Sequence, residues 1–317
     1  MEIYVVSDVG GTQIRVASYD AGTLNPIKQK KITTQAKGQL PVDRLIKLIQ
    51  EIKEDHTIKA IAVAAPGFLD PDLGIVYEAP NIPGWENYPL RKILEDVFKI
   101  PIFLGNDANL AALGEWKFGA GIGHSNLLYL TISTGIGSGV IVNNNLLLGH
   151  KGLAGEFGHV TVLPDGPMCG CGKQGHIEAI ASGTGILNYV NEQISAGRNT
   201  ILNRLEKITG IDISQAAQNG DALAIEAYNR AGYYLGIALA NFLHMLNPSI
   251  VIFGGGVSSS GELLFEPMRK SLDERLISPA YLDGLTFTTA QLGDDVGLKG
   301  ALALLVTKMS SNLLVYT

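Results

Sequence analysis

Apolar residues recur along the chain in short runs whose length and alternation are typical of β-strands. Residues 3–9 (IYVVSDV) form one such run, and residues 12–20 (TQIRVASYD) alternate apolar and polar positions from Ile14 onward. A second apolar run, residues 127–132, is also followed by a glycine-rich turn and another strand-like segment. Each half of the chain is therefore predicted to begin with a strand, a Gly/Thr turn and a strand.

The apolar pattern changes to helical spacing over residues 222–246, and Asn247 and Pro248 end the segment. Its most apolar part, residues 231–246, is too short to cross a membrane, which takes about 18 to 20 residues, and it contains Asn241 and His244. We expect a buried helix. Gly232 and Gly236 allow either a close contact with another helix or ordinary core packing.

Three polar clusters interrupt otherwise apolar surroundings between the two predicted hairpins. They read AIAVAAPGFLD (residues 60–70), EAPNIPGW (78–85) and IPIFLGNDANLAALGE (100–115). In the third cluster a strand ends at Asn106 and Asp107, and a helix of small residues begins. An aspartate in this position is often only a helix cap, but here it is also well placed to accept a hydroxyl proton during phosphoryl transfer.

The composition favours a globular protein that binds small molecules. The 317 residues are 46% hydrophobic, and the net charge of −6 gives no basic surface for nucleic acid or an anionic membrane. The mean hydropathy is +0.19. The first residues, MEIYVVSDVGG, do not resemble a secretory signal, so we expect a cytoplasmic protein without nucleic-acid or membrane partners.

Glycine-rich turns are the strongest indication of a nucleotide. The turns at residues 8–12 (DVGGT) and 133–139 (STGIGSG) combine glycines, whose backbone N–H groups can approach a phosphate, with threonine hydroxyls. Glycine turns are also common in hairpins without any ligand. Residues 254–256 (GGG) follow a buried strand, where a flat base would fit, although a helix-capping loop explains them equally well. The P-loop and dinucleotide fingerprints are not found.

Both cysteines of the chain lie in residues 156–179 (EFGHVTVLPDGPMCGCGKQGHIEA), together with two of its six histidines. A disulfide between Cys169 and Cys171 would be strained, because only one residue separates them. The cluster therefore indicates either a metal site or plain packing.

Several of these motifs, in this order, resemble the ROK family of sugar kinases and repressors. They are DVGGT, GNDANLAALGE, TISTGIGSG, Glu156 to His159 (E-x-G-H), CGCG-x-x-G-x-x-E and FGGGVS, and the likeness extends from about Val6 to Ala303. Within the family the chain is most similar to bacterial-type glucokinases. The resemblance implies transfer of the γ-phosphate of Mg-ATP to the 6-hydroxyl of glucose.

The fold that the resemblance implies is α/β, with two actin-like lobes of ribonuclease H-like topology and an active-site cleft between them. The small lobe would comprise residues 1–113 and 297–317, and the large lobe, with a zinc-binding loop, residues 114–296. Each lobe would then supply one phosphate-binding hairpin. The family also implies a homodimer formed through the large lobe.

The resemblance implies a role for individual residues in binding and catalysis. Asp107 would be the general base that takes the proton of the 6-hydroxyl. The sugar would contact Gly67, Asn81, Asn106, Asp107, Glu156, His159 and Glu178. ATP and Mg²⁺ would be held by Asp8, Gly10, Gly11, Thr12, Thr134, Gly135 and Gly137, with Gly254, Gly255 and Gly256 beside adenine.

The resemblance also implies a structural zinc ion, which the family binds through one histidine and three cysteines spaced H-x9-C-x-C-x4-C. This chain has His159, Cys169 and Cys171 at those positions, but His176 stands where the family has its third cysteine. Because imidazole and thiolate are both good zinc ligands, a His2Cys2 site is chemically reasonable. The alternative is that His176 points away and the loop holds no metal.

Three other functions remain open from the sequence. The chain could phosphorylate another sugar, namely fructose, mannose, N-acetylglucosamine or N-acetylmannosamine. It could be a non-catalytic sugar-binding protein, although Asp107 and both hairpins argue against this. It could be a sugar-responsive repressor, but the first strand begins too close to Met1 for a preceding DNA-binding domain, and the acidic charge also disfavours it.

Overall fold

The computed structural model describes residues 1–313 and contains two five-stranded sheets with the same topology. The first sheet has the order β3-β2-β1-β4-β8 and the second β11-β10-β9-β12-β13. In each, the first three strands are antiparallel neighbours, and the last two lie parallel to the first. The predicted pair of strand-turn-strand units is thus confirmed, and each unit begins one sheet.

The strands and helices of the first lobe extend from the N-terminus to residue 118. In chain order they are β1 (Glu2–Val9), β2 (Gln13–Asp20), β3 (Pro26–Thr33), α1 (Pro41–Lys53), β4 (Thr57–Ala65), β5 (Phe68–Asp70), β6 (Ile75–Glu78), β7 (Glu86–Tyr88), α2 (Leu90–Phe98), β8 (Ile102–Asn106) and α3 (Asp107–Phe118). Strands β5, β6 and β7 form a small separate sheet.

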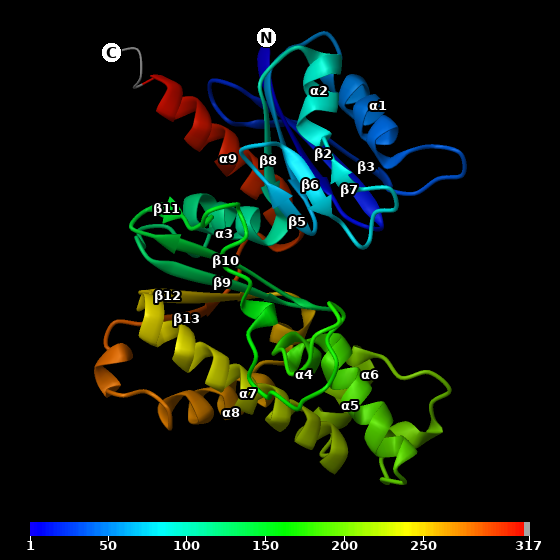
Figure 1. The fold of residues 1–317 in the computed structure, drawn as a ribbon, viewed down its shortest axis with the longest axis vertical. Coiled ribbons are helices and arrows are strands. Elements are labelled where there is room, and N and C mark those ends of the chain that lie inside the picture. Colours follow the sequence, from blue (N-terminus) through cyan, green and yellow to red (C-terminus); the bar gives the residue numbers. More distant parts are fainter. Residues whose placement is uncertain (314–317) are drawn as a thin grey trace.

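The second lobe follows. Its strands and helices are β9 (Leu127–Ile132), β10 (Ile136–Val142), β11 (Asn145–Leu146), α4 (Glu178–Ala181), α5 (Gly183–Ser195), α6 (Gly210–Gln218), α7 (Ala222–Leu246), β12 (Ile250–Gly254), α8 (Glu262–Asp273) and β13 (Thr286–Thr289). The last described helix, α9 (Val296–Leu313), returns to the first lobe. Figure 1 shows the two lobes one above the other, with α9 in red running back along the upper one.

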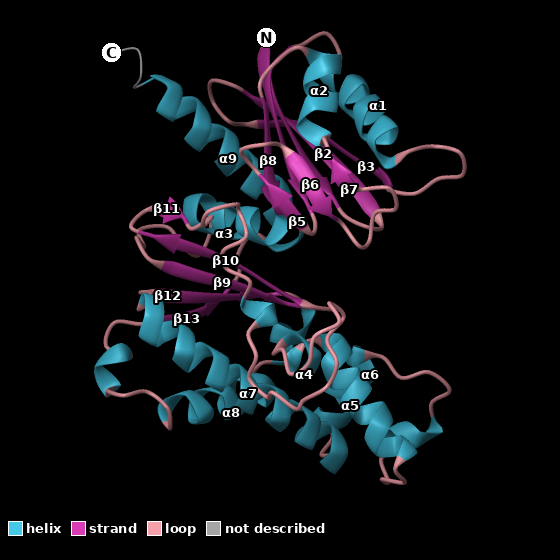
Figure 2. Ribbon diagram, in the orientation of Figure 1, coloured by secondary structure: helices cyan, strands magenta, loops and turns pink. Residues whose placement is uncertain are grey.

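Helices α3 and α9 lie between the two sheets and join the lobes. Their buried residues share one apolar cluster with alternate residues of both sheets, among them Val6 and Ala62 from the first and Tyr129 and Ile252 from the second. The outer face of the first sheet packs against α1 and α2, and that of the second against α5, α7 and α8. Figure 2 shows the resulting alternation of helical and sheet layers. The expected two-lobed α/β fold is confirmed.

Helix α7 shows how the sequence specifies one of these layers. Asp221 accepts the N–H of Ala224 at 3.0 Å as its N-cap, and Asn247 ends it in the left-handed conformation. Gly232 and Gly236 face α8, where a Cβ atom would lie 2.5 Å from the carbonyl oxygens of Leu264 and Met268. The glycines therefore serve a close helix contact. In the described residues no helix is both long and apolar enough to cross a membrane.

The predicted boundary between the lobes at residue 113 remains a proposal, because α3 continues to Phe118 and contacts both sheets. The C-terminal helix α9 begins at Val296, one residue before the predicted start of the second small-lobe segment at residue 297. Residues 314–317 of the predicted small lobe lie outside the described residues. Trp85, in the polar cluster at residues 78–85, is buried and stacks on Tyr88, so its role is structural.

Candidate active site

The junction of β8 and α3 gives two neighbouring residues different tasks. Asn106 is the helix cap, because its Oδ1 accepts the N–H groups of Ala108 and Asn109 at 3.0 and 3.1 Å. Its Nδ2 donates to the carbonyl of Gly67 at 3.0 Å, which ties the loop after β4 to this helix. Since Asn106 caps the helix, Asp107 is free for another role.

Asp107 has the protonation behaviour expected of a base near neutral pH. Its side chain reaches solvent although protein atoms surround it closely, as in a concave site. This crowding, together with the negative charges of Asp8 and Glu156, raises the pKa of Asp107 to about 6, while the N–H of Ala108 opposes the rise. The carboxylate is therefore ionised at pH 7 and more basic than an ordinary aspartate.

Besides Asn106, the first lobe contributes two further predicted sugar-binding residues, Gly67 and Asn81. Gly67 has a φ of 83°, and a Cβ atom there would lie 2.0 Å from the backbone carbonyl oxygen of Glu78, so only glycine fits. Asn81 is exposed, and its Cβ would lie 2.7 Å from a Cβ at Gly11 of the first hairpin turn. The predicted sugar and phosphate residues of this lobe are thus neighbours.

The second lobe contributes Glu156, His159 and Glu178 from a loop and the start of α4. The loop is anchored by Phe157, which is buried in the core between Glu156 and His159. Glu156 reaches solvent, but the protein atoms packed around it and the charge of Glu178 raise its pKa, whereas His159 lowers it. Glu178 accepts the N–H of Ile136 at 3.0 Å and lies 3.3 Å from the Cys169 sulfur. It therefore connects the second hairpin turn to the cysteine loop.

The four predicted zinc ligands form one cluster. The possible ligand atoms of His159, Cys169, Cys171 and His176 all lie within 4.8 Å of one another. The two Nδ1 atoms are 3.3 Å apart, and the sulfur-to-Nδ1 separations are 3.8 Å for Cys169 and His159 and 3.3 Å for Cys171 and His176. A tetrahedral zinc site with ordinary bond lengths has edges of roughly 3.3 to 3.8 Å. The four possible ligand atoms and their spacing fit a zinc ion, and the Nδ1 of His176 lies within this cluster.

A cavity of about 1010 Å³ opens beside Asp8 and brings together two of the three glycine loops. Asp8, Gly10, Gly11 and Thr12 line it from the first lobe, and Gly254, Gly255 and Gly256 line it from the second. The space is ample for a nucleotide. Since the two loops are far apart in the sequence, only the assembled fold places them in one cavity.

The remaining predicted phosphate residues do not line this cavity. A Cβ atom at Gly135 would lie 2.5 Å from the Glu178 carboxylate, and one at Gly137 would lie 3.0 Å from Ala108. The carbonyl of Thr134 accepts the N–H of Thr184 at 3.3 Å. Thr134, Gly135 and Gly137 thus lie with Glu178 and the start of α3, while Gly255 packs against Ile132 just before this turn.

Several residues that the sequence analysis missed also line the cavity. They include Arg15, Gln29, Lys31, Tyr129, Thr131, Phe253, Asp294 and Asp295. Arg15 pairs with Asp8 and donates to the carbonyl of Asp294. Asp8, Arg15 and Lys31 are register partners on β1, β2 and β3, so their side chains share one face of the sheet. In the sequence, Arg15 and Lys31 occupy polar positions in the alternating patterns of β2 and β3, and this alternation could have placed both on the face of Asp8.

A second cavity, of about 370 Å³, lies along the edge strand β8 and is lined by residues of β8, α2, α3 and α9. Of the predicted site residues only Asn106 lines it. Asp107 lines neither cavity, whereas seven of the predicted nucleotide-binding residues line the larger one, which is therefore the candidate nucleotide site.

Comparisons with known proteins show which family this chain resembles. The family model described as ROK family matches residues 4–308. A curated glucokinase of Halalkalibacterium halodurans is 38% identical over 308 residues, covering 94% of this chain and 93% of its own length. A xylose repressor of Caldicellulosiruptor bescii is 32% identical, covering 85% of this chain and 70% of its own length.

The fold is similar to that of a solved glucokinase. The crystal structure of a ROK family glucokinase from Streptomyces griseus, in complex with glucose and AMPPNP, has a TM-score of 0.77 and 36% sequence identity. The alignment covers 95% of this chain and 98% of the Streptomyces chain.

Proposed function

The chain belongs to the ROK family, and we propose that it is an ATP-dependent glucokinase, which transfers the γ-phosphate of ATP to the 6-hydroxyl of glucose. The observation that carries the proposal is the position of Asp107. Its carboxylate has a pKa raised to about 6 and is accessible to solvent. It follows Asn106 of the first lobe and lies close to Glu156 of the second, both of which are predicted to bind the sugar. It also lies close to Asp8, which lines the large cavity.

In the proposed reaction Asp107 orients the sugar hydroxyl and accepts its proton as the oxygen attacks phosphorus. Gly67, Asn81 and Asn106 would bind sugar hydroxyls from the first lobe, and Glu156, His159 and Glu178 from the second. Asn106 retains one amide hydrogen for the sugar, because its other amide hydrogen and its oxygen are already bonded. Closure of the two lobes around the sugar would exclude water, which otherwise competes for the phosphoryl group.

The donor site is proposed to be the cavity of about 1010 Å³. Backbone N–H groups of Gly10 and Gly11 would hold phosphate oxygens, and Gly254 to Gly256 leave space for a flat base. Arg15 and Lys31 add positive charge beside these turns. The carboxylate of Asp8 suits a magnesium ion, whose chemistry is to neutralise charge on the transferred phosphate.

The proposed zinc site is structural, since its four protein ligands leave no open position. With Nδ1 of His159 facing the metal cluster, Nε2 is the nitrogen left for a sugar hydroxyl. Cys169, 3.3 Å from Glu178, lies beside a second sugar-binding residue. Zinc would therefore hold two sugar-binding side chains in place without taking part in the reaction.

The test is release of ADP by the purified protein with Mg-ATP and a panel of hexoses and N-acetylhexosamines, ranked by kcat/KM. We expect a clear preference for glucose and loss of turnover in Asp107→Asn. Turnover confined to another sugar would replace glucose as the substrate and leave the kinase proposal standing. Absence of turnover with every sugar would contradict the kinase and favour a binding protein, or a repressor as in the xylose repressor relative.

A cytoplasmic location and a homodimer formed through the large lobe are further proposals. Two cysteines held with histidines in a metal-type cluster, and not in a disulfide, are typical of a reducing compartment. Light scattering after size-exclusion chromatography tests the dimer, for which a mass near 33.7 kDa would be the contrary result.

A further inference from the structure

A buried carboxylate lies at the far end of α3 from Asp107. Glu115 has no exposed surface, and no ion pair in the described part of the chain includes it. Three backbone N–H groups bind it instead: Ala120 at 2.8 Å, and Gln291 and Leu292 at 2.9 Å each. A buried charge is costly unless it is fully hydrogen-bonded, so a residue of this kind requires a reason.

The loop that Glu115 binds is a wall of the large cavity. Ala290 lines the cavity just before Gln291 and Leu292, and Gly293, Asp294 and Asp295 line it just after them. Glu115 therefore holds the centre of this segment by accepting the backbone N–H groups of Gln291 and Leu292. The bonds run from the segment's backbone to a helix in the core, whereas the cavity-lining residues on either side face the proposed donor.

The same segment is connected to the first hairpin. Arg15 donates to the carbonyl of Asp294 and pairs with Asp8, and Gln29 donates to Asp295 at 3.3 Å. A Cβ atom at Gly297 would lie 2.5 Å from an Asp8 oxygen, so the start of α9 packs directly against Asp8. A shift of the segment would thus displace the groups around the proposed phosphate site as well as its wall.

We propose that Glu115 is a positioning residue of the nucleotide site, which holds residues 290–295 in the shape that binds the phosphoryl donor. The inference rests on the proposed function, because it takes the large cavity as the donor site. Helix α3 then serves both substrates: its first residue is the base Asp107, and Glu115, about 12 Å further along, fixes the donor wall. Donor affinity depends on Glu115, while sugar affinity does not.

The substitution Glu115→Gln tests this with little change in shape. A glutamine side chain has only one acceptor oxygen, so its NH2 group must face at least one N–H that the carboxylate now accepts. The bonds that remain lose their charge and become weaker. Should the amide prevent folding, Glu115→Asp provides a second variant that keeps the charge but withdraws it from the segment by one methylene group.

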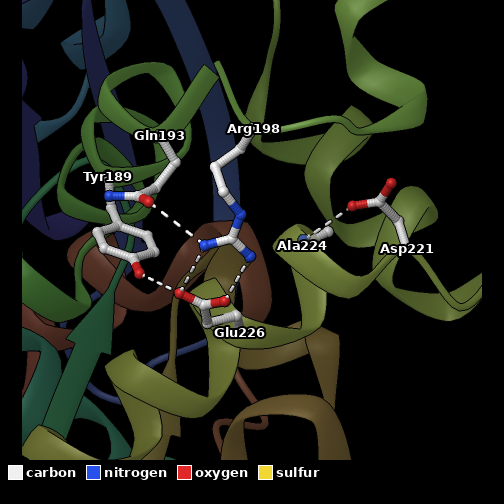
Figure 3. A network of polar contacts seen from close by, with 6 residues as sticks. All are labelled: Tyr189, Gln193, Arg198, Asp221, Ala224 and Glu226. Atoms are coloured by element: carbon white, nitrogen blue, oxygen red, sulfur yellow. Dashed lines mark hydrogen bonds and ion pairs between the residues drawn. The ribbon is translucent and has the colours of Figure 1, made fainter. Parts of the chain in front are cut away.

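A matched control is Asp221, another buried carboxylate that binds backbone N–H groups. It accepts from Ile201 at 2.9 Å and Ala224 at 3.0 Å at the start of α7. Figure 3 shows Asp221 on this helix, beside the network of Tyr189, Arg198 and Glu226 in the second lobe. Asp221 does not line the large cavity. Asp221→Asn should therefore destabilise the fold and leave donor binding unchanged.

The experiment measures the Kd of AMPPNP and of glucose by calorimetry, the Tm, and hydrogen exchange at Gln291 and Leu292. For Glu115→Gln we expect the Kd of AMPPNP to rise about tenfold, which corresponds to about 1.4 kcal/mol, with the Kd of glucose within about twofold of wild type. Exchange at both amides should accelerate. For Asp221→Asn only the Tm should fall.

Three results would overturn the inference. They are an unchanged AMPPNP Kd in folded Glu115→Gln, an equal weakening of both ligands, and an equal rise of the AMPPNP Kd in Asp221→Asn. Failure of the proposed function gives a different result, in which the wild-type protein binds neither AMPPNP nor glucose.

Discussion

At the scale of single residues, the site depends on the different roles of two adjacent residues, Asn106 and Asp107. Asn106 satisfies the first N–H groups of α3 and holds Gly67, so the adjacent carboxylate of Asp107 is not needed as the helix cap and can take its proposed role. The sequence alone does not separate these roles, because either residue type is a good helix cap. The raised pKa of Asp107 depends first on the protein atoms packed around it and then on the charges of Asp8 and Glu156, which are about 99 and 49 positions away in the chain.

Asp107→Asn removes the proposed base but keeps the size of the side chain. We expect kcat to fall by at least about 10², with the Kd of glucose changed by less than about threefold, because proton acceptance acts mainly in the transition state. Steady-state kinetics and calorimetry check this. Asn109→Asp, which adds a carboxylate in the same turn of the helix, tests whether charge at another position can substitute. Retained turnover in Asp107→Asn would refute the assignment.

The pKa of Asp107 predicts the acid side of the pH profile. Since the folded-state pKa, about 6, is above the usual aspartate value and the base must be ionised, kcat/KM for glucose should fall about tenfold per pH unit below pH 6. Glu156→Gln removes one of the charges that raise this pKa, so the pKa of Asp107 should decrease, as seen by NMR titration of its carboxyl. A pKa that stays near 4 in the wild type would contradict the prediction.

At the scale of elements, the glycine turns and helix ends place chemistry at the edges of two similar sheets. Each hairpin turn could be recognised from its sequence, since glycine, threonine and the flanking strands are local features. The partners of each turn could not. The turn at residues 8–12 shares a cavity with the glycines after β12, and the turn at residues 133–139 contacts Glu178 and α3.

The zinc loop should affect sugar binding more than the donor. Substituting Cys171→Ser removes one proposed ligand without touching a sugar-binding residue, so zinc content should fall and the KM for glucose should rise about tenfold or more, with the KM for ATP nearly unchanged. Metal analysis and kinetics check this. His176→Cys, which restores the family pattern, should retain zinc. A zinc-free protein with wild-type kinetics would show that the cluster does not position the site.

The contact between α3 and α9 should tolerate no side chain at Gly300. A Cβ atom there would lie 2.0 Å from the Leu110 carbonyl, so Gly300→Ala should lower the free energy of unfolding by about 1 to 3 kcal/mol. Gly210→Ala is the control, because a Cβ atom at this helix start meets nothing within 4 Å. Urea unfolding of both variants measures the effect, and equal stability of the two would count against close packing of α3 and α9.

At the scale of the whole molecule, the proposed sugar site is divided between two lobes that α3 and α9 connect. Gly67, Asn81 and Asn106 come from the first lobe, while Glu156 and Glu178 come from the second, and the side chains of Asn81 and Glu156 are exposed. A sugar that contacts both sets would stabilise a closer approach of the lobes.

Saturating glucose should therefore reduce the radius of gyration measured by small-angle X-ray scattering. A hexose that fails in the activity panel serves as the control, since it should leave the scattering unchanged. If glucose binds by calorimetry and the radius of gyration stays the same, the lobes do not close on the sugar alone.

The sequence by itself determined the features that depend on neighbours in the chain. These are the paired hairpins, helix α7 with its end at Asn247, the place of Asp107 at the end of β8, and the spacing of the four proposed metal ligands. Each follows from periodicity, capping or ligand spacing over a few residues, so local physics is sufficient.

Only the tertiary structure decided which of these features meet. It places Asp8, Gly254, Arg15 and Lys31 in the lining of one cavity. It also places the second turn beside the start of α3, and it binds Glu115 to the backbone of residues 291 and 292. These contacts join residues up to about 246 positions apart and depend on how two sheets pack around α3 and α9. A single sequence carries no local signal for such packing, because the same side chain is a solvated surface group in one arrangement and a wall of the site in another.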